Sequence, residues 1–465
     1  MDITRRHLMQ RGIAFGLGFA GLKALLVPGA AYADSLRLRV GNGFGPLIPD
    51  PKGMLDLPNG FSYRVISSFR EVMDDGLTVP AKHDGMCALP GPDGRTILIR
   101  NHEIDSNDAA RGAFGSRGQR ITDDIRSKMF DAGKGEVPAL GGTTTLVYDT
   151  KTQTLERHFM SLAGTVYNCA GGVTPWGTWL TCEESMTRAN DRYAKDHGYV
   201  FEVRPTVEPE LQRAQPLEAL GRFQHEAVAF DPASGILYMT EDLADGLLYR
   251  LIPKVAGQLG EGGRLQCLMI KDRPRVDTRN WEARVISRGE SLPVEWFDVE
   301  DIFGADNDIR VVNHARGAAI FGRGEGMWYT NGSVHFACTV GGRTKHGQIF
   351  KYTPSSKEGT AQERLSPGTL ELFIEPDDGN VIGNCDNITA APWGDLIVCE
   401  DSCFEDDRVN HLLGVTPTGD VYKLAKNSGS SSELAGAVFS PDGSTLFVNR
   451  QGDGQTFAIT GPWRT

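Results

Sequence analysis

Short apolar runs bounded by glycine and proline recur along most of the chain. One kind is a glycine followed by a β-rich segment with an aromatic residue and a charge, found at 141–149, 198–203, 246–250, 347–352 and 419–424. A hairpin pattern with a Pro-x-x-Gly or Pro-Asp-Gly turn is found at 227–239 and 435–448. β-branched and aromatic residues between such turns predict strands. We expect an all-β protein, with one helix around 123–130.

The clearest internal repeat ends on paired carboxylates. Its first copy, residues 168–185, contains Asn-Cys-Ala-Gly-Gly, Pro-Trp-Gly, an apolar strand and Cys-Glu-Glu-Ser. The second copy begins at Asn384, and residues 392–402 align with 175–185 without a gap. Repeated strand units with irregular spacing are typical of a β-propeller. We expect six blades with long inter-strand insertions. Seven blades are an alternative, as is a β-sandwich or jelly roll, which would not explain the repeats.

The N-terminal segment 1–33 has the features of a cleaved export signal. Arg5-Arg6 is the pair of a twin-arginine signal, residues 12–28 are mildly apolar and glycine-rich, and Ala31-Tyr32-Ala33 is a small-x-small cleavage site. Lys23 and the short length of the run disfavour a membrane anchor. We expect export by the twin-arginine machinery and no stable membrane insertion.

Residues 34–465 should then form a single propeller domain, a periplasmic or secreted monomer. The formal net charge of −12 argues against binding to nucleic acid or to an anionic lipid surface. None of the eight cysteines belongs to a Cys-x-x-Cys pair, so the pattern favours no zinc site. Cys182 and Cys399 occupy matching repeat positions, and we expect both to be small buried residues.

Acidic residues gather where strands are expected to begin or end. The candidates are Glu183, Glu184, Glu226, Glu241, Asp242, Glu325, Asp386, Glu400 and Asp401, with Asp84 and Glu103 at similar positions. The innermost strand of every propeller blade lines the central axis, so these side chains should converge on one pocket. Several carboxylates would repel one another there unless cations neutralised them. Oxygen ligands suit calcium, and a subsite with the thiolate of Cys169 suits a transition metal.

A glycine-rich segment, residues 322–329, places Arg323 two positions before Glu325. Glycine on both sides of the arginine lets the backbone approach a bound ion closely. An arginine near a metal-binding acid can hold an oxyanion through two hydrogen bonds while the metal polarises it. The alternative is a surface arginine–glutamate pair in a glycine turn.

Together, several motifs resemble the PhoX alkaline phosphatase family. They are Asn-Cys-Ala-Gly-Gly-x-Thr-Pro-Trp-Gly-Thr-Trp-Leu-x-Cys-Glu-Glu, His-Asp-Gly-Met, Asn-His-Glu, Arg-Phe-x-His-Glu-Ala, and Cys-Asp-Asn followed by Pro-Trp-Gly-Asp-Leu. The resemblance covers about residues 55–455. It implies a six-bladed propeller exported by the twin-arginine route, with a ferric iron pair and calcium ions on its axis. The implied activity is hydrolysis of small phosphomonoesters.

Carried over by motif, the resemblance implies iron ligands at Cys169, Glu226 and Glu325. Arg323 would bind the phosphate, although its Arg-x-Glu element has Gly324 where the better-known members have proline. Calcium ligands would come from Glu183, Glu184, Glu241, Asp242, Asp386 and Glu400. The implied reaction is attack of a metal-held oxide or hydroxide on phosphorus, with Arg323 stabilising the developing charge.

Two other functions are compatible with axial carboxylates. A calcium-dependent propeller lactonase would use them but would need neither Cys169 nor an oxyanion-binding Arg323. A non-catalytic, calcium-stabilised binding propeller would keep them as scaffold and show no turnover. Analysis of bound metal separates the three functions, because iron with calcium favours the phosphatase and calcium alone favours the others.

Overall fold

The computed structural model describes residues 38–104, 109–135, 137–402 and 409–464. The chain divides into two units, Met1–Leu38 and Arg39–Thr465. The expected export signal at 1–33 lies outside the described residues. Within the described ranges, no helix has both the length and the apolar character needed to span a membrane.

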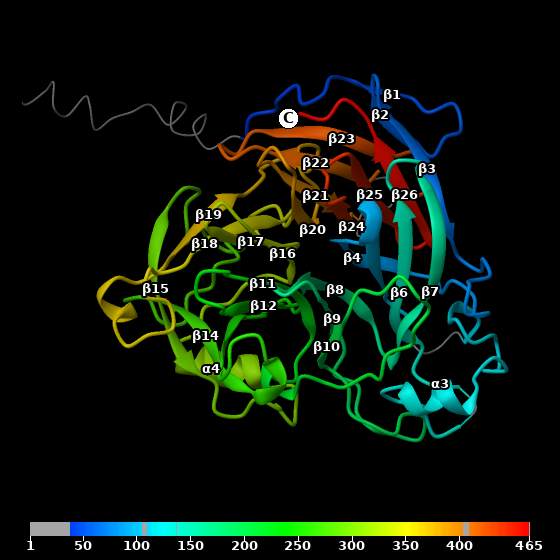
Figure 1. The fold of residues 1–465 in the computed structure, drawn as a ribbon. Helices are drawn as coiled ribbons and strands as arrows, with labels where there is room; N and C mark the ends of the chain where they lie inside the picture. The colour runs from blue at the N-terminus through cyan, green and yellow to red at the C-terminus, as the bar shows by residue number, and fades with distance from the viewer. Residues whose placement is uncertain (1–37, 105–108, 136, 403–408, 465) are drawn as a thin grey trace, which may run out of the picture. The chain divides into compact units, whose positions relative to one another are not determined.

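Strands dominate the regular structure of the second unit, which confirms the all-β prediction. In the described residues they form five hydrogen-bonded sheets, arranged around a common centre in a propeller-like way (Figure 1). Three of the sheets are small. The first consists of β4 (His83–Pro90), β5 (Arg95–His102), β6 (Gly141–Asp149) and β7 (Thr154–Thr165), and the second of β8 (Asn168–Val173), β9 (Trp179–Glu183) and β10 (Val200–Val203). The third consists of β24 (Leu434–Phe439), β25 (Thr445–Arg450), β26 (Gln455–Thr460) and β3 (Ser62–Ser68).

Two sheets are larger. One has six strands in the order β1 (Leu47–Ile48), β2 (Leu55–Pro58), β23 (Val421–Asn427), β22 (His411–Val415), β21 (Leu396–Glu400) and β20 (Cys385–Ala390). The other has nine, in the order β11 (His225–Phe230), β12 (Leu237–Glu241), β13 (Leu248–Pro253), β14 (Gly263–Ile270), β15 (Ser291–Asp298), β19 (Thr369–Ile374), β18 (Gln348–Thr353), β17 (Ser333–Cys338) and β16 (Gly324–Thr330). In the nine-stranded sheet, β15 pairs with both β14 and β19 and so joins two four-stranded sets.

Helices are few and short in the part of the chain that the structure describes. They are α3 (Asp123–Lys128), α4 (Ile309–Arg316) and the 3-10 turns η1 (Pro92–Gly94), η2 (Ala109–Arg111), η3 (Glu218–Leu220), η4 (Leu259–Glu261) and η5 (Glu363–Leu365). α3 begins where the Thr122 hydroxyl accepts a hydrogen bond from the N–H of Ile125 at 3.2 Å. It lies inside the segment that was expected to be helical.

The described strands include six hairpins at the centre of the unit: β4–β5, β8–β9, β11–β12, β16–β17, β20–β21 and β24–β25. Their first strands contact one another in a closed circle, from β4 through β8, β11, β16, β20 and β24 back to β4. Each hairpin pairs the first residue of its inner strand with the last residue of its second strand. In each, the register shifts within the next four residues. Such β-bulges re-aim the side chains beside them.

The bulges of neighbouring hairpins pack against one another, and glycine makes this close approach possible. A Cβ atom on Gly85 would lie 2.6 Å from Cα of Ala170, and one on Gly326 would lie 2.6 Å from Cα of Asn387. Glycine thus lets the inner strands of neighbouring hairpins pack closely at this level.

Apolar side chains fill the space between neighbouring sheets. The two ends of the second unit are joined by strand pairing. Strand β3 pairs with β26, with Ser62 opposite Thr460, so an N-terminal strand completes the sheet that contains the last strand. The seven cysteines among the described residues are buried and free. Cys182 and Cys399 belong to this set and are fully buried in apolar clusters, as predicted.

Gly326→Ala should lower the free energy of unfolding by about 2 kcal/mol or more, because the new methyl group would overlap the backbone of Asn387. Thermal unfolding followed by circular dichroism measures the effect. Gly260→Ala is the matched control, since a Cβ atom there would meet nothing within 4 Å in the described structure. Equal melting temperatures for the two variants would contradict the packing described above.

Candidate active site

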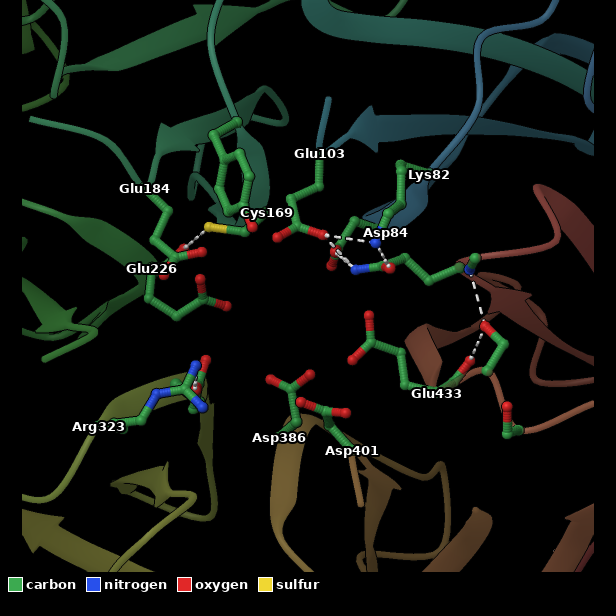
Figure 2. A pocket seen from close by; sticks show the side chains of 16 residues that line it. Lys82, Asp84, Glu103, Cys169, Glu184, Glu226, Arg323, Asp386, Asp401 and Glu433 are labelled. Atoms are coloured by element: carbon green, nitrogen blue, oxygen red, sulfur yellow. Dashed lines mark hydrogen bonds and ion pairs between the residues drawn. The ribbon is translucent and has the colours of Figure 1, made fainter. Parts of the chain in front are cut away.

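A cavity of about 350 Å³ lies where the six inner strands begin (Figure 2). Of the described residues that line it, eight are acids: Asp84, Glu103, Glu184, Glu226, Glu325, Asp386, Asp401 and Glu433. Two are basic, Lys82 and Arg323, and the others are Tyr167, Cys169, Ser431, Ser432, Gln451 and Gly452. Every one of the hairpins supplies at least one of the acids. Segments far apart in the chain thus share one strongly acidic pocket.

Three positions that recur in the hairpins supply nearly all of these side chains. The residue before the inner strand provides Lys82, Tyr167, Arg323 and Glu433. The second residue of the inner strand provides Asp84, Cys169, Glu226, Glu325 and Asp386. The residue after the second strand provides Glu103, Glu184, Asp401 and Gln451. We call these the first, second and third site positions.

A backbone hydrogen bond holds the third site position to the first in each hairpin. The N–H of Glu103, for example, donates to the carbonyl of Lys82 at 3.0 Å, and the N–H of Glu184 donates to Tyr167 at 3.0 Å. In four of the described hairpins the first site position has a left-handed backbone, because φ is 53° at Lys82, 56° at Tyr167, 53° at Arg323 and 56° at Asn384. Non-glycine residues rarely adopt this conformation, which costs on the order of 1 kcal/mol or more.

The paired acids at the end of β9 face different surroundings, because neighbouring residues of a strand point to opposite sides. Glu184 lines the cavity. Glu183 is fully buried and accepts hydrogen bonds from His197 Nδ1 at 2.7 Å, from the N–H of Gly198 at 2.8 Å and from the N–H of Val166 at 2.9 Å. Glu183 therefore holds the loops beside the cavity.

Glu241 and Glu400 have the same place in their hairpins as Glu183, and neither lines the cavity. Glu400 accepts from the N–H of Gly383 at 2.7 Å and from the N–H of His411 at 2.9 Å. Glu241 accepts from the hydroxyl of Tyr249 at 2.8 Å. These carboxylates face the protein scaffold, and the acid that follows Glu400 is the one that lines the cavity.

Among the described residues, three groups could each hold a metal ion, since in each group one ligand atom per residue lies within 4.8 Å of the others. They are Cys169, Glu184 and Glu226; Glu226, Glu325 and Asp386; and Asp84, Glu103 and Glu433. Glu226 belongs to two groups, and its buried Oε2 has no hydrogen-bond partner among the described residues. A buried carboxylate oxygen without a donor is costly. The donor set therefore fits bound cations, and Glu226 is shared by two of the groups.

Burial and mutual repulsion raise the pKa values of the cavity acids. Burial raises the pKa of Glu226 well above its ordinary value, and the charges of Asp386 and Asp84 raise it further. Burial, with the charge of Asp401 added, raises the pKa of Asp386 to about 7. The pKa of the Cys169 thiol is also well above its ordinary value, through burial and the charge of Glu226. Cations that bind here must therefore displace protons.

Arg323 lies on one side of the cavity, with its guanidinium pointing inward (Figure 2). Its Nε and Nη2 donate to the two carboxylate oxygens of Asp242 at 2.8 and 2.6 Å. Nη2 also lies 3.0 Å from Oε1 of Glu325. A guanidinium held in this way is suited to bind an oxyanion beside the second group of acids.

Lys82 lies on the opposite side, near the third group of acids (Figure 2). Its ammonium donates to Oε1 of Gln451 at 2.6 Å and lies 4.0 Å from Oε2 of Glu103. Nε2 of Gln451 donates to Oδ2 of Asp84 at 2.8 Å and also to Glu103. Only oxygen ligands are available in the third group, which is the donor type that calcium prefers.

The structure brings most of the residues selected from the sequence into the cavity: Cys169, Glu184, Glu226, Arg323, Glu325 and Asp386. Asp242 is not among the residues that line the cavity, but its carboxyl contacts two residues that do, Arg323 and Glu184. Lys82, Tyr167, Gln451 and Glu433 also line the cavity, but the sequence assigned no role to them. Strand alternation could have singled out Asp401 over its neighbour, but Glu433 stands in a serine-rich loop without a repeated motif.

Known proteins are similar to this chain in sequence and in structure. A family model described as alkaline phosphatase PhoX matches residues 42–454. The chain belongs to the PhoX alkaline phosphatase family. Membership confirms the resemblance noted in the sequence and makes this PhoX chain a phosphoric monoester hydrolase.

Solved structures similar to this PhoX chain have been found. One is Pseudomonas fluorescens PhoX in complex with vanadate, a transition state analogue, which is 19% identical with a TM-score of 0.65 over 92% of this chain and 98% of that chain. A gluconolactonase from Xanthomonas campestris is 11% identical with a TM-score of 0.40 over 90% and 98% of the two chains. The first similarity supports the propeller-like all-β fold, and the second is too weak to inform it. No curated protein matches the sequence.

His197 stabilises the loops beside the cavity as part of a buried charged triad. Nδ1 lies 2.7 Å from Oε1 of Glu183 and Nε2 lies 3.3 Å from Oδ2 of Asp131, and all three side chains are fully buried. Burial by itself would lower the pKa of His197, but the charges of Glu183 and Asp131 outweigh it and raise the pKa to about 9. The folded pKa of His197 exceeds its unfolded value of about 6.5. Protonation of His197 therefore stabilises the fold fully below about pH 6.5, and this stabilisation is lost as the pH rises through about 9.

His197→Asn should therefore lower the free energy of unfolding more at pH 6 than at pH 10. The difference should be on the order of 3 kcal/mol, from the change in pKa between the unfolded and folded states. Denaturant unfolding of the parent and the variant at the two pH values measures it. An equal loss at both would mean that His197 is not held as a cation in the folded protein.

Proposed function

We propose that this chain is a metal-dependent phosphomonoesterase whose central cavity holds a pair of iron ions together with calcium. One observation carries the proposal: Glu226 belongs to two neighbouring ligand groups and has a buried oxygen without a hydrogen-bond partner in the described structure. Membership of the PhoX family supports a phosphomonoester as the substrate. Eight acids in one pocket also support cations as resident cofactors.

We assign the iron pair to the two groups that share Glu226. Cys169 and Glu184 complete the first group, and Glu325 and Asp386 complete the second. The sulfur ligand distinguishes this region of the cavity from an all-oxygen site and favours a transition metal over calcium. A carboxylate shared by both groups would keep the two ions at a fixed separation.

Calcium is assigned to Asp84, Glu103 and Glu433, which offer only oxygen. Of the calcium ligands expected from the family resemblance, Glu184 and Asp386 stay in the cavity as members of the first two groups. We assign Glu183, Glu241 and Glu400 to the support of the surrounding loops instead, because none of them lines the cavity and protein donors bind at least one oxygen of each carboxylate.

The residues of the chain suggest how the reaction would proceed. Bound cations would neutralise the acids, polarise a phosphoryl oxygen and lower the pKa of a water molecule. Arg323 would donate hydrogen bonds to the phosphoryl oxygens and stabilise the negative charge that grows on them in the transition state.

Three further features are part of the proposal. Counting β11–β14 and β16–β19 as separate blades joined by β15 gives a six-bladed propeller, with one inner hairpin to each blade. The N-terminal sequence supports export by the twin-arginine machinery to the periplasm or the medium. In that compartment the enzyme would act as a monomer on small phosphate esters.

The purified, metal-analysed protein should hydrolyse phosphomonoesters and leave phosphodiesters and lactones largely intact. Exhaustive chelation should abolish hydrolysis and lower the melting temperature together, because repelling carboxylates are left behind. Assays with the three substrate classes before and after chelation measure both effects. Lactone hydrolysis by protein that contains calcium alone would favour the lactonase. Activity and melting temperature that survive chelation would contradict a metal-dependent site.

Cys169→Ala and Arg323→Ala should lose activity in different ways. The first should lose transition metal while most calcium stays bound, since the thiolate is removed. The second should keep its metals but lose about 3 kcal/mol or more of transition-state stabilisation, roughly a hundredfold in rate. Elemental analysis and steady-state kinetics distinguish them. A Cys169→Ala protein with its full iron content, or an Arg323→Ala protein as fast as the parent, would contradict the assignment.

A further inference from the structure

Asp242 stands apart from the residues at the same position in other hairpins. It follows β12 directly, as Glu184 follows β9 and Asp401 follows β21, yet it does not line the cavity with them. None of the three ligand groups found among the described residues contains it. Asp242 is only 4% exposed, and both of its carboxylate oxygens accept hydrogen bonds from Arg323.

The contact between Asp242 and Arg323 fixes the plane of the guanidinium. The hairpin frame sets where the Arg323 side chain begins, since its backbone is held at a φ of 53°. The remaining torsions of an arginine side chain carry about 2 kcal/mol of rotamer entropy, and a bidentate bond to a planar carboxylate restricts them. Bonds of 2.8 Å from Nε and 2.6 Å from Nη2 supply such a restraint.

The second acidic partner of Arg323 could not provide the same restraint in the loaded enzyme. Glu325 lies 3.0 Å from Nη2, but it is also a member of a metal-binding group. A cation bound by Glu325 would compete with the guanidinium for the same carboxylate. Asp242 belongs to none of the ligand groups in the described structure, and both of its oxygens accept from Arg323, although its carboxyl also contacts Glu184 of the first group. Asp242 would therefore remain as the partner of Arg323 under those conditions.

We infer that Asp242 is a positioning residue, which orients Arg323 toward the phosphoryl group and does not ligate a metal. This inference rests on the proposed phosphate-binding role of Arg323. With Nε and Nη2 bonded to Asp242, the plane of the guanidinium presented to the substrate would be set by this carboxylate. The family resemblance counted Asp242 among the calcium ligands, so the two assignments make opposite predictions for metal content.

Asp242→Asn tests the inference, since it keeps the size of the side chain but loses the charge and one acceptor. The variant should retain the iron and calcium content of the parent. Its affinity for inorganic phosphate should fall roughly tenfold or more, and its kcat on a phosphomonoester should fall by a similar factor. Elemental analysis, calorimetric titration with phosphate and steady-state kinetics provide the three readouts.

Asp245→Asn is the matched control. Asp245 lies in the same loop and accepts a hydrogen bond from Nε of Arg310 at 2.7 Å, but neither residue lines the cavity. The control should keep its metals, its phosphate affinity and its kcat. Asp242→Glu is a second test variant, should the asparagine protein fail to fold. It keeps the charge but displaces the carboxylate by one methylene group, and should also weaken phosphate binding.

Coupling between the two residues gives a further readout. Phosphate affinity in Arg323→Ala and in the double variant Asp242→Asn/Arg323→Ala should be equally low, because the two side chains act as a unit. Loss of bound metal from Asp242→Asn would overturn the inference, and so would unchanged phosphate affinity with full metal content. A parent protein that binds phosphate but hydrolyses no ester would overturn the proposed function and leave this inference standing.

Discussion

Repulsion among eight carboxyl groups in a single cavity of about 350 Å³ is the constraint on which the rest of this structure depends. Such a set can be ionised only if cations bind, and without them burial raises the pKa values of acids such as Glu226 and Asp386. The close-packed bulges and the buried supports of the loops keep the acids together against that repulsion. Metal binding and folding should therefore be strongly linked in this protein.

The six hairpins repeat one backbone arrangement and differ in the residue types at the three site positions, which determines where acids and basic side chains lie in the cavity. At the second position, four hairpins carry an acid, one carries Cys169 and one carries Ala435. Where Ala435 offers no ligand, the flanking positions of the same hairpin contribute Glu433 and Gln451. Arg323 and Lys82 stand on opposite sides of the cavity, so positive charge is available at both ends of the acidic cluster (Figure 2).

Much of this arrangement could be predicted from the sequence, because repeated motifs mark equivalent positions. The repeat that contains Cys169, together with the motifs around Glu226 and Glu325, indicated that distant segments share one site. Neighbouring residues of a strand point to opposite sides, so the sequence could also have indicated that Asp401 faces the cavity and Glu400 does not. Glu433 carries no motif, and the pairing of β15 with two neighbouring strands depends on long-range contacts that composition and spacing do not encode.

We expect cations to bind among acids from different hairpins, with Glu226 shared between two of the cations. A crystal structure of the purified protein, with anomalous diffraction data collected on both sides of the iron absorption edge, tests this most directly. We expect two iron peaks that both lie beside Glu226, one of them within ligand distance of Cys169. A separate calcium peak should lie near Asp84. Acids that are hydrogen-bonded to one another around ordered water, with no anomalous peak in the cavity, would contradict this expectation.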